Sequence, residues 1–209
     1  MLKFAPILIA LIYGYTMYRF SAWRTKSNLD QNSTLLDDKP LKYLTDKMAK
    51  SLDLSEIKVN VYETEAINGL AAPDGRIFIT RGFLNKYKIN EVTAEELASV
   101  VAHELGHVAL GHSRKRMIDF SGQNAMRVAL GAILSRVLPG IGGIIANGLG
   151  TLLMAKLSRS DEFEADAYAT ALLMQSGLSV EAQTSLFEKL DTLTGNSGLS
   201  PACVHTICS

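Results

Sequence analysis

Two histidines four residues apart flank a glutamate in the segment His103-Glu104-Leu105-Gly106-His107. On a helix, side chains at positions i and i+4 lie on the same face, one turn apart. Two imidazoles placed in this way can bind one Zn²⁺, and Glu104 would then lie beside the metal, where it could take a proton from a bound water. The spacing therefore predicts a metal site that carries its own general base.

The residues around this motif favour a buried site helix, although short motifs of this kind also arise by chance in helices that bind no metal. Thr93 and Glu96 form a capping box, which predicts a helix start about three turns before His103. Gly106 costs roughly 1 kcal/mol of helix propensity relative to alanine. A glycine at this position indicates that another element approaches the helix closely.

A third metal ligand is expected from an acidic segment that contains Glu162 and Asp166. These two residues are also four apart, so on a helix both carboxylates point to one side, whereas Glu164 faces away. One carboxylate can bind the metal, and the other can accept a hydrogen bond from the free ring N–H of a ligating histidine. The alternative is an ordinary acidic first turn that is stabilised by the helix dipole.

Together these motifs resemble family forty-eight of the metallopeptidases, which includes the HtpX heat-shock proteases, the CAAX prenyl proteases and the mitochondrial Oma-type proteases. The resemblance rests on His-Glu-Leu-Gly-His at residues 103–107 and on Ser-Arg-x-x-Glu-Phe-Glu-Ala-Asp at residues 158–166. Residues 68–84 are similar to the family's Asn-Ala-Phe-Ala-x-Pro-Gly-Gly-x-Ile-x-Val-Thr-x-Gly segment. The similarity covers roughly residues 40–190.

The resemblance implies a role for each site residue. His103, His107 and Glu162 would bind one zinc ion per chain, Glu104 would be the catalytic base, and Asp166 would be the hydrogen-bond partner of a ligating histidine. The implied fold is α+β and mainly helical, a zincin of the gluzincin type with a small sheet. The implied activity is that of a metalloendopeptidase, in which Glu104 takes a proton from a zinc-bound water and delivers it to the leaving amine.

Other patterns predict the elements that position this site. A helix is expected from Pro40 to about Leu52, and strands are expected over residues 57–62 and 76–80. Residues 76–80 are similar to the exposed edge strand with which gluzincins pair the substrate backbone, and a structural hairpin strand is an equal alternative. His112 lies about 140° around a continuing helix from His107, so it is expected away from the metal, in a structural or exposed position.

Two apolar segments raise the question of a membrane. Residues 1–23 are expected to form an uncleaved single-pass anchor helix, followed by a polar linker at residues 24–39. A cleaved signal peptide is the alternative, and no small-x-small cleavage site supports it. Residues 128–155 contain Arg136 as their one charge and predict an apolar helical hairpin. That hairpin could cover the cleft, dip into the membrane surface or simply be buried.

Composition limits the partners and the number of domains. The 21 Lys and Arg residues balance the 21 Asp and Glu residues, so no charge excess points to nucleic acid. A chain of 209 residues allows one main domain, which we assign to residues 40–195. Residues 196–209 form a tail in which Cys203 and Cys208 can be bonded or reduced, depending on the compartment. The oligomeric state is not predicted.

Two functions from different classes follow. The first is a membrane-anchored zinc endopeptidase of protein quality control, with misfolded or membrane-associated polypeptides as substrates and a bacterial inner membrane as its location. The second is a zinc-stabilised adaptor or chaperone-like protein with little or no turnover. The second is kept because the tail lacks the His-Pro motif of relatives, for which His205 and Arg159 are possible substitutes. Glu104 favours the first, because zinc binding alone needs no base.

Overall fold

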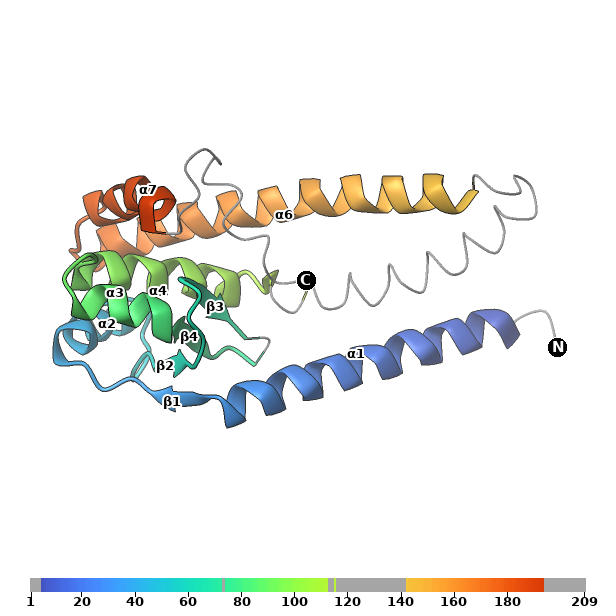
Figure 1. The fold of residues 1–209 in the computed structure, drawn as a ribbon, viewed down its shortest axis with the longest axis horizontal. Helices are drawn as coiled ribbons and strands as arrows, with labels where there is room; N and C mark the ends of the chain where they lie inside the picture. Colours follow the sequence, from blue (N-terminus) through green and yellow to red (C-terminus); the bar gives the residue numbers. More distant parts are fainter. Residues whose placement is uncertain (1–4, 73, 113–114, 116–141, 194–209) are drawn as a thin grey trace.

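Helix α4 (Ala94–Ala109) lies at the centre of the fold, between a small sheet and the long helix α6 (Gly142–Gln175), as Figure 1 shows. The computed structural model describes residues 5–72, 74–112, 115 and 142–193. Residues 101–107 of α4 are all buried, because the helix is covered by neighbours on every side. The capping box is present as expected, with the Thr93 hydroxyl accepting from the Glu96 backbone N–H and the Glu96 carboxylate accepting from the Thr93 N–H.

The sheet is mixed and has four short strands in the order β1-β2-β4-β3. Strands β2 (Val59–Tyr62) and β4 (Ile77–Thr80) are parallel, whereas β1 (Ser33–Leu35) and β3 (Gly69–Ala71) pair antiparallel at the two edges. The expected strands at residues 57–62 and 76–80 are therefore confirmed as β2 and β4. The fold class, mainly helical with a small sheet, is confirmed as well.

Of the two alternatives for residues 76–80, the structure favours the structural hairpin strand over the exposed edge strand. Strand β4 has a partner on both sides, and all of its residues are buried. Its continuous apolar run, Ile77-Phe78-Ile79, is typical of a strand that is covered on both faces. The edge strand that packs against α4 is β3 instead.

Three further helices complete the core around α4. Helix α2 (Lys39–Ser51) starts with Asp38 as its N-cap and Pro40 in its first turn, which confirms the expected helix. Helices α3 (Arg81–Lys88) and α7 (Glu181–Leu193) cover other parts of the same core. The central side chains of the core are fully buried: Met48, Phe83, Leu97, Val101 and Leu173.

Helix α1 (Ala5–Gln31) is longer than the expected anchor, since its last turns pack against the sheet. Leu29 is buried with Ala72 and Phe78, and Asp30 pairs with Arg76 at 2.7 Å. Residues 24–39, expected to be a polar linker, therefore hold the end of α1, strand β1 and the first residue of α2. Among the residues that the structure describes, no helix is both long and apolar enough to cross a membrane.

Helix α6 contains the second part of the segment that was expected to form an apolar hairpin. It runs without a break from Gly142 through Glu162 to Gln175, so residues 142–155 belong to the helix that carries the acidic segment. In Figure 1 this first part of α6 extends away from α4 instead of covering it. Residues 128–141, the other part of the predicted hairpin, lie outside the described residues.

A buried carboxylate links α4 to α7 and gives stability a dependence on pH. Glu96 is 2% exposed and accepts from Ser185 Oγ at 2.6 Å and pairs with Lys189 Nζ at 2.7 Å. Burial alone would raise the pKa of this carboxyl, but the bonds from Lys189, Ser185 and the Thr93 backbone outweigh it and lower the pKa. A carboxylate with a lowered folded-state pKa stabilises the fold above its unfolded pKa, and this contribution is lost as pH falls through the folded pKa.

Glu96→Gln is therefore expected to lower the free energy of unfolding by about 2 kcal/mol at pH 7, the value typical of hydrogen bonds to a charged group. The difference from wild type should shrink as the pH falls below about 4.5, because the carboxyl then takes up a proton in the unfolded chain before it does so in the folded protein. Urea unfolding of both proteins in chelator, at pH values from 7 to 3.5, measures the difference. Glu95→Gln, an exposed change in the same turn, is the matched control. A difference that stays constant over this range would contradict the prediction.

Candidate metal centre

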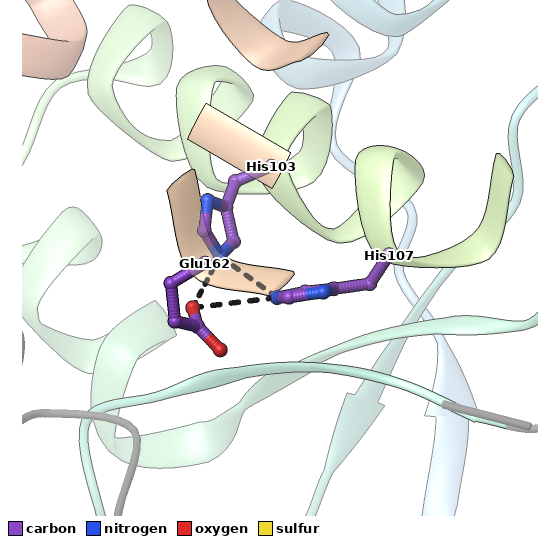
Figure 2. A group of neighbouring side chains, drawn as sticks. All are labelled: His103, His107 and Glu162. Atoms are coloured by element: carbon purple, nitrogen blue, oxygen red, sulfur yellow. Dashed lines mark hydrogen bonds and ion pairs between the residues drawn. The ribbon is translucent and has the colours of Figure 1, made fainter. Parts of the chain in front are cut away.

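Three side chains from two helices converge on one point. His103 and His107 come from α4 and Glu162 comes from α6, as Figure 2 shows. The two Nε2 atoms are 3.0 Å apart, and Glu162 Oε2 lies 3.4 Å from His103 Nε2 and 3.5 Å from His107 Nε2. The fold thus brings all three predicted ligands together, although Glu162 is far from the two histidines in the sequence.

The dimensions of this triangle fit zinc. Ligands bound tetrahedrally at about 2.0–2.1 Å lie roughly 3.3 Å from one another. The three measured separations, 3.0, 3.4 and 3.5 Å, are close to that value. Two imidazoles and one carboxylate also form a donor set typical of catalytic zinc, which leaves a fourth position for water. The residues present therefore fit a catalytic zinc ion.

Close packing of α4 on α6 makes this convergence possible. A Cβ atom added to Gly106 would lie 3.0 Å from the backbone oxygen and 3.1 Å from the Cα of Ala165. The two backbones are therefore in direct contact, only three residues along α6 from Glu162. This contact confirms the expectation that Gly106 marks the close approach of another element.

Asp166 is placed to orient the first histidine. Its Oδ1 lies 2.8 Å from His103 Nδ1, which leaves His103 Nε2 facing the other two candidate ligands. Burial would lower the pKa of His103, but hydrogen bonds to Asp166 and Glu162 and the charge of Glu104 outweigh it and raise the pKa to about 10. A proton and a metal ion therefore compete for this ring.

Glu104 lies beside His103 in one pocket and against the edge strand β3. Its side chain is 3% exposed, and its Oε1 would lie 3.1 Å from a Cβ atom placed on Gly69 of β3. Only a residue without a side chain fits here, because the same Cβ would lie 2.6 Å from Val100 Cγ1. A pocket opens beside Glu104 and His103. Apolar side chains dominate its lining: Ile67, Phe83, Val100, Leu186, Phe187 and Leu190.

One residue of the site differs from its expected place. His112 is not one of the three grouped candidate ligands, as expected, but it is 2% exposed and its Nδ1 lies 3.0 Å from His107 Nδ1, a contact with a candidate ligand that was not expected. The expected placement assumed a helix that continues past His107, whereas α4 ends at Ala109 and Gly111 turns the chain with a φ of 71°. Gly111 was the available signal, since glycine in this conformation commonly ends helices.

Arg159 and His205 are the two possible substitutes for the His-Pro motif of relatives. Arg159 is exposed on α6. His205 lies in the tail together with Cys203 and Cys208, outside the described residues.

Comparison with known proteins agrees with this geometry. The model of Peptidase family M48 matches residues 36–206. Metalloprotease LoiP of Escherichia coli K12 is 33% identical over 159 residues, which cover 74% of this chain and 60% of that protein. Metalloprotease YcaL of the same strain is 31% identical over 160 residues, with 75% and 60% covered.

A more distant relative is the mitochondrial metalloendopeptidase OMA1 of Arabidopsis thaliana, which is 28% identical over 142 residues, 67% of this chain and 27% of that protein. The chain thus spans 60% or less of the length of these relatives. Because the family model matches most of the sequence, and because the site geometry fits the zinc that this family uses, the chain belongs to peptidase family M48.

Proposed function

We propose that this protein is a zinc-dependent endopeptidase in which His103, His107 and Glu162 hold the metal and Glu104 is the general base. The observation that carries the proposal is the position of Glu104, a buried carboxylate that lies beside His103 in the same pocket and against Gly69 of the edge strand β3. A zinc ion that needed only to stabilise the fold would require no carboxylate there.

Zinc bound at this site supplies a Lewis acid and a water of lowered pKa. Glu104 would take up a proton from the attacking water at its carboxylate and then give it to the leaving amine. Asp166 holds the His103 ring through Nδ1, so that Nε2 keeps its direction during this cycle. These steps need no covalent intermediate with the protein.

The surroundings of Glu104 support a polypeptide substrate. An extended peptide can add to an edge strand through backbone hydrogen bonds, and β3 is an edge strand of the sheet in the described part of the chain; this form of binding depends little on sequence. The apolar pocket next to Glu104 and His103 suits an apolar side chain close to the scissile bond. Both features favour unfolded chains, in which apolar residues are accessible.

We propose in addition that the part of α1 up to Trp23 associates with a membrane and that the substrates are misfolded or membrane-associated proteins. Support comes from the large apolar side chains that α1 exposes, among them Ile12, Tyr15, Phe20 and Trp23. Apolar and aromatic side chains on a helix surface are typical of contact with a lipid interface. A bacterial inner membrane is the proposed location.

The purified protein is expected to cleave unfolded casein and to stop when a zinc chelator is added, because the water is activated only at the bound metal. Adding back zinc in slight excess should restore cleavage. The measurement is the appearance of casein fragments over time. A natively folded protein offered in place of casein is the substrate control. Cleavage that continues in chelator would exclude zinc catalysis. A zinc-loaded protein that binds casein without cleaving it would favour the adaptor function instead.

A further inference from the structure

The second histidine of the metal site has a histidine as its partner. His107 Nδ1 lies 3.0 Å from His112 Nδ1, and both side chains are almost completely buried, with 5% and 3% exposed. The two rings meet edge to face at 67°, with their centroids 5.2 Å apart. A nitrogen-to-nitrogen distance of 3.0 Å is that of a hydrogen bond, so one of these nitrogens carries a proton and the other accepts it.

The end of α4 brings His112 back to this position. Leu110 caps the helix, and the N–H of Gly111 bonds to the Val108 carbonyl at 3.1 Å. Gly111 then adopts a φ of 71°, a conformation that residues with a side chain rarely take, and this reverses the direction of the chain. His112 consequently lies beside His107 although it is five residues further along.

Metal binding at His107 determines the direction of the hydrogen bond. His107 Nε2 faces His103 and Glu162, so a metal held by these residues takes the lone pair of Nε2. A neutral ring that ligates through Nε2 carries its proton on Nδ1. His107 Nδ1–H therefore donates, and His112 Nδ1 accepts.

Acidic neighbours hold His112 in the required tautomer. If His112 accepts at Nδ1, its own proton is on Nε2, and this atom faces Glu164 Oε2 at 3.4 Å and Asp161 Oδ1 at 3.8 Å. Asp161 is 2% exposed and pairs with Lys115 Nζ at 3.1 Å, which fixes the carboxylate in place. Every proton in the series from His107 to the carboxylates then has an acceptor.

We propose that His112 is a positioning residue of the zinc site, which accepts a hydrogen bond from His107 and holds that ring with Nε2 toward the metal. The inference rests on the proposed zinc site. His103 and His107 are then held in different ways, His103 by the carboxylate of Asp166 and His107 by a neutral imidazole. Loss of such a partner typically weakens metal binding by about 10- to 100-fold.

Two substitutions separate the hydrogen bond from the volume of the side chain. His112→Asn keeps an acceptor near the position of Nδ1, whereas His112→Leu fills a similar space without one. We expect the zinc dissociation constant, measured by competition with a chromophoric chelator, to rise about 10- to 100-fold in His112→Leu. It should stay within about threefold of wild type in His112→Asn. Equal zinc binding in wild type and His112→Leu would overturn the proposal, and so would an equal loss in both variants.

A measurement on the wild-type protein tests the proposal even if the His112 variants do not fold. In the zinc-loaded wild type, nitrogen-15 correlation spectra of the histidine rings should show a slowly exchanging proton on His107 Nδ1 and a proton on His112 Nε2. A proton on His112 Nδ1 would overturn the proposal without any substitution. If the wild type binds no zinc, the proposed function itself fails. If it binds zinc and cleaves casein but the His112 results are negative, only this inference fails.

Discussion

Glu104→Gln is expected to reduce casein cleavage by about 10²- to 10⁴-fold, the range that a positioned general base contributes. The amide has nearly the shape of the carboxylate and fits the same buried position beside His103 and against β3. It cannot take a proton at neutral pH, so the attacking water loses its base. Zinc content after dialysis against saturating zinc should remain that of wild type, since Glu104 is not one of the candidate ligands.

The decisive comparison is activity per bound zinc ion. Glu95→Gln changes an exposed residue in the first turn of the same helix and serves as the matched control, with wild-type activity expected. Metal content and proteolysis are measured on the same samples. If Glu104→Gln cleaves casein as fast as the control, Glu104 is not the base and the proposed function fails.

Glu162→Gln should weaken zinc binding by about a hundredfold or more. A complete structural zinc site is worth about 10–16 kcal/mol, or roughly 3 kcal/mol for each of four ligands, and 1.4 kcal/mol corresponds to a tenfold change. An amide oxygen replaces the anionic Oε2 only poorly. Activity at limiting zinc should fall with the metal content, because Glu162 acts through the ion it holds.

A graded series tests this assignment. Asp166→Asn is expected to weaken zinc binding by about 10- to 100-fold, less than Glu162→Gln, since Asp166 acts on the metal only through His103. Glu188→Gln, an exposed change on α7, should leave binding unchanged. The same competition with a chelator ranks all three. Tighter zinc binding in Glu162→Gln than in Asp166→Asn would contradict the role of Glu162 as a ligand.

Features set by neighbouring residues in the chain were predictable from the sequence. The capping box at Thr93 and the i, i+4 spacing of His103 and His107 depend only on helix geometry, and the structure contains both. Glu162 and Asp166 were expected to share a face of one helix for the same reason, and both lie against His103. The family resemblance then paired the two helices, which their spacing alone could not do.

Features that depend on tertiary packing were not predictable. Strands β3 and β4 are both short and apolar, and only their pairing reveals that β3 is the edge. His112 was expected on the far side, because the helix was assumed to continue beyond Ala109. Residues 24–31 looked like a linker because their polarity hides Leu29, an apolar side chain that is buried with Ala72 and Phe78.

The contact between Gly106 and Ala165 lies close to Glu162 and far from the outer end of α6. About 35 Å of helix lies between Gly142 and this contact, whereas Glu162 lies only about 4.5 Å from it, at 1.5 Å per residue. If α6 tilts as a rigid rod about that point, a movement of about 4 Å at its outer end shifts Glu162 by roughly 0.5 Å. A tilt that displaces the outer end of α6 would thus leave the geometry of the metal site nearly constant.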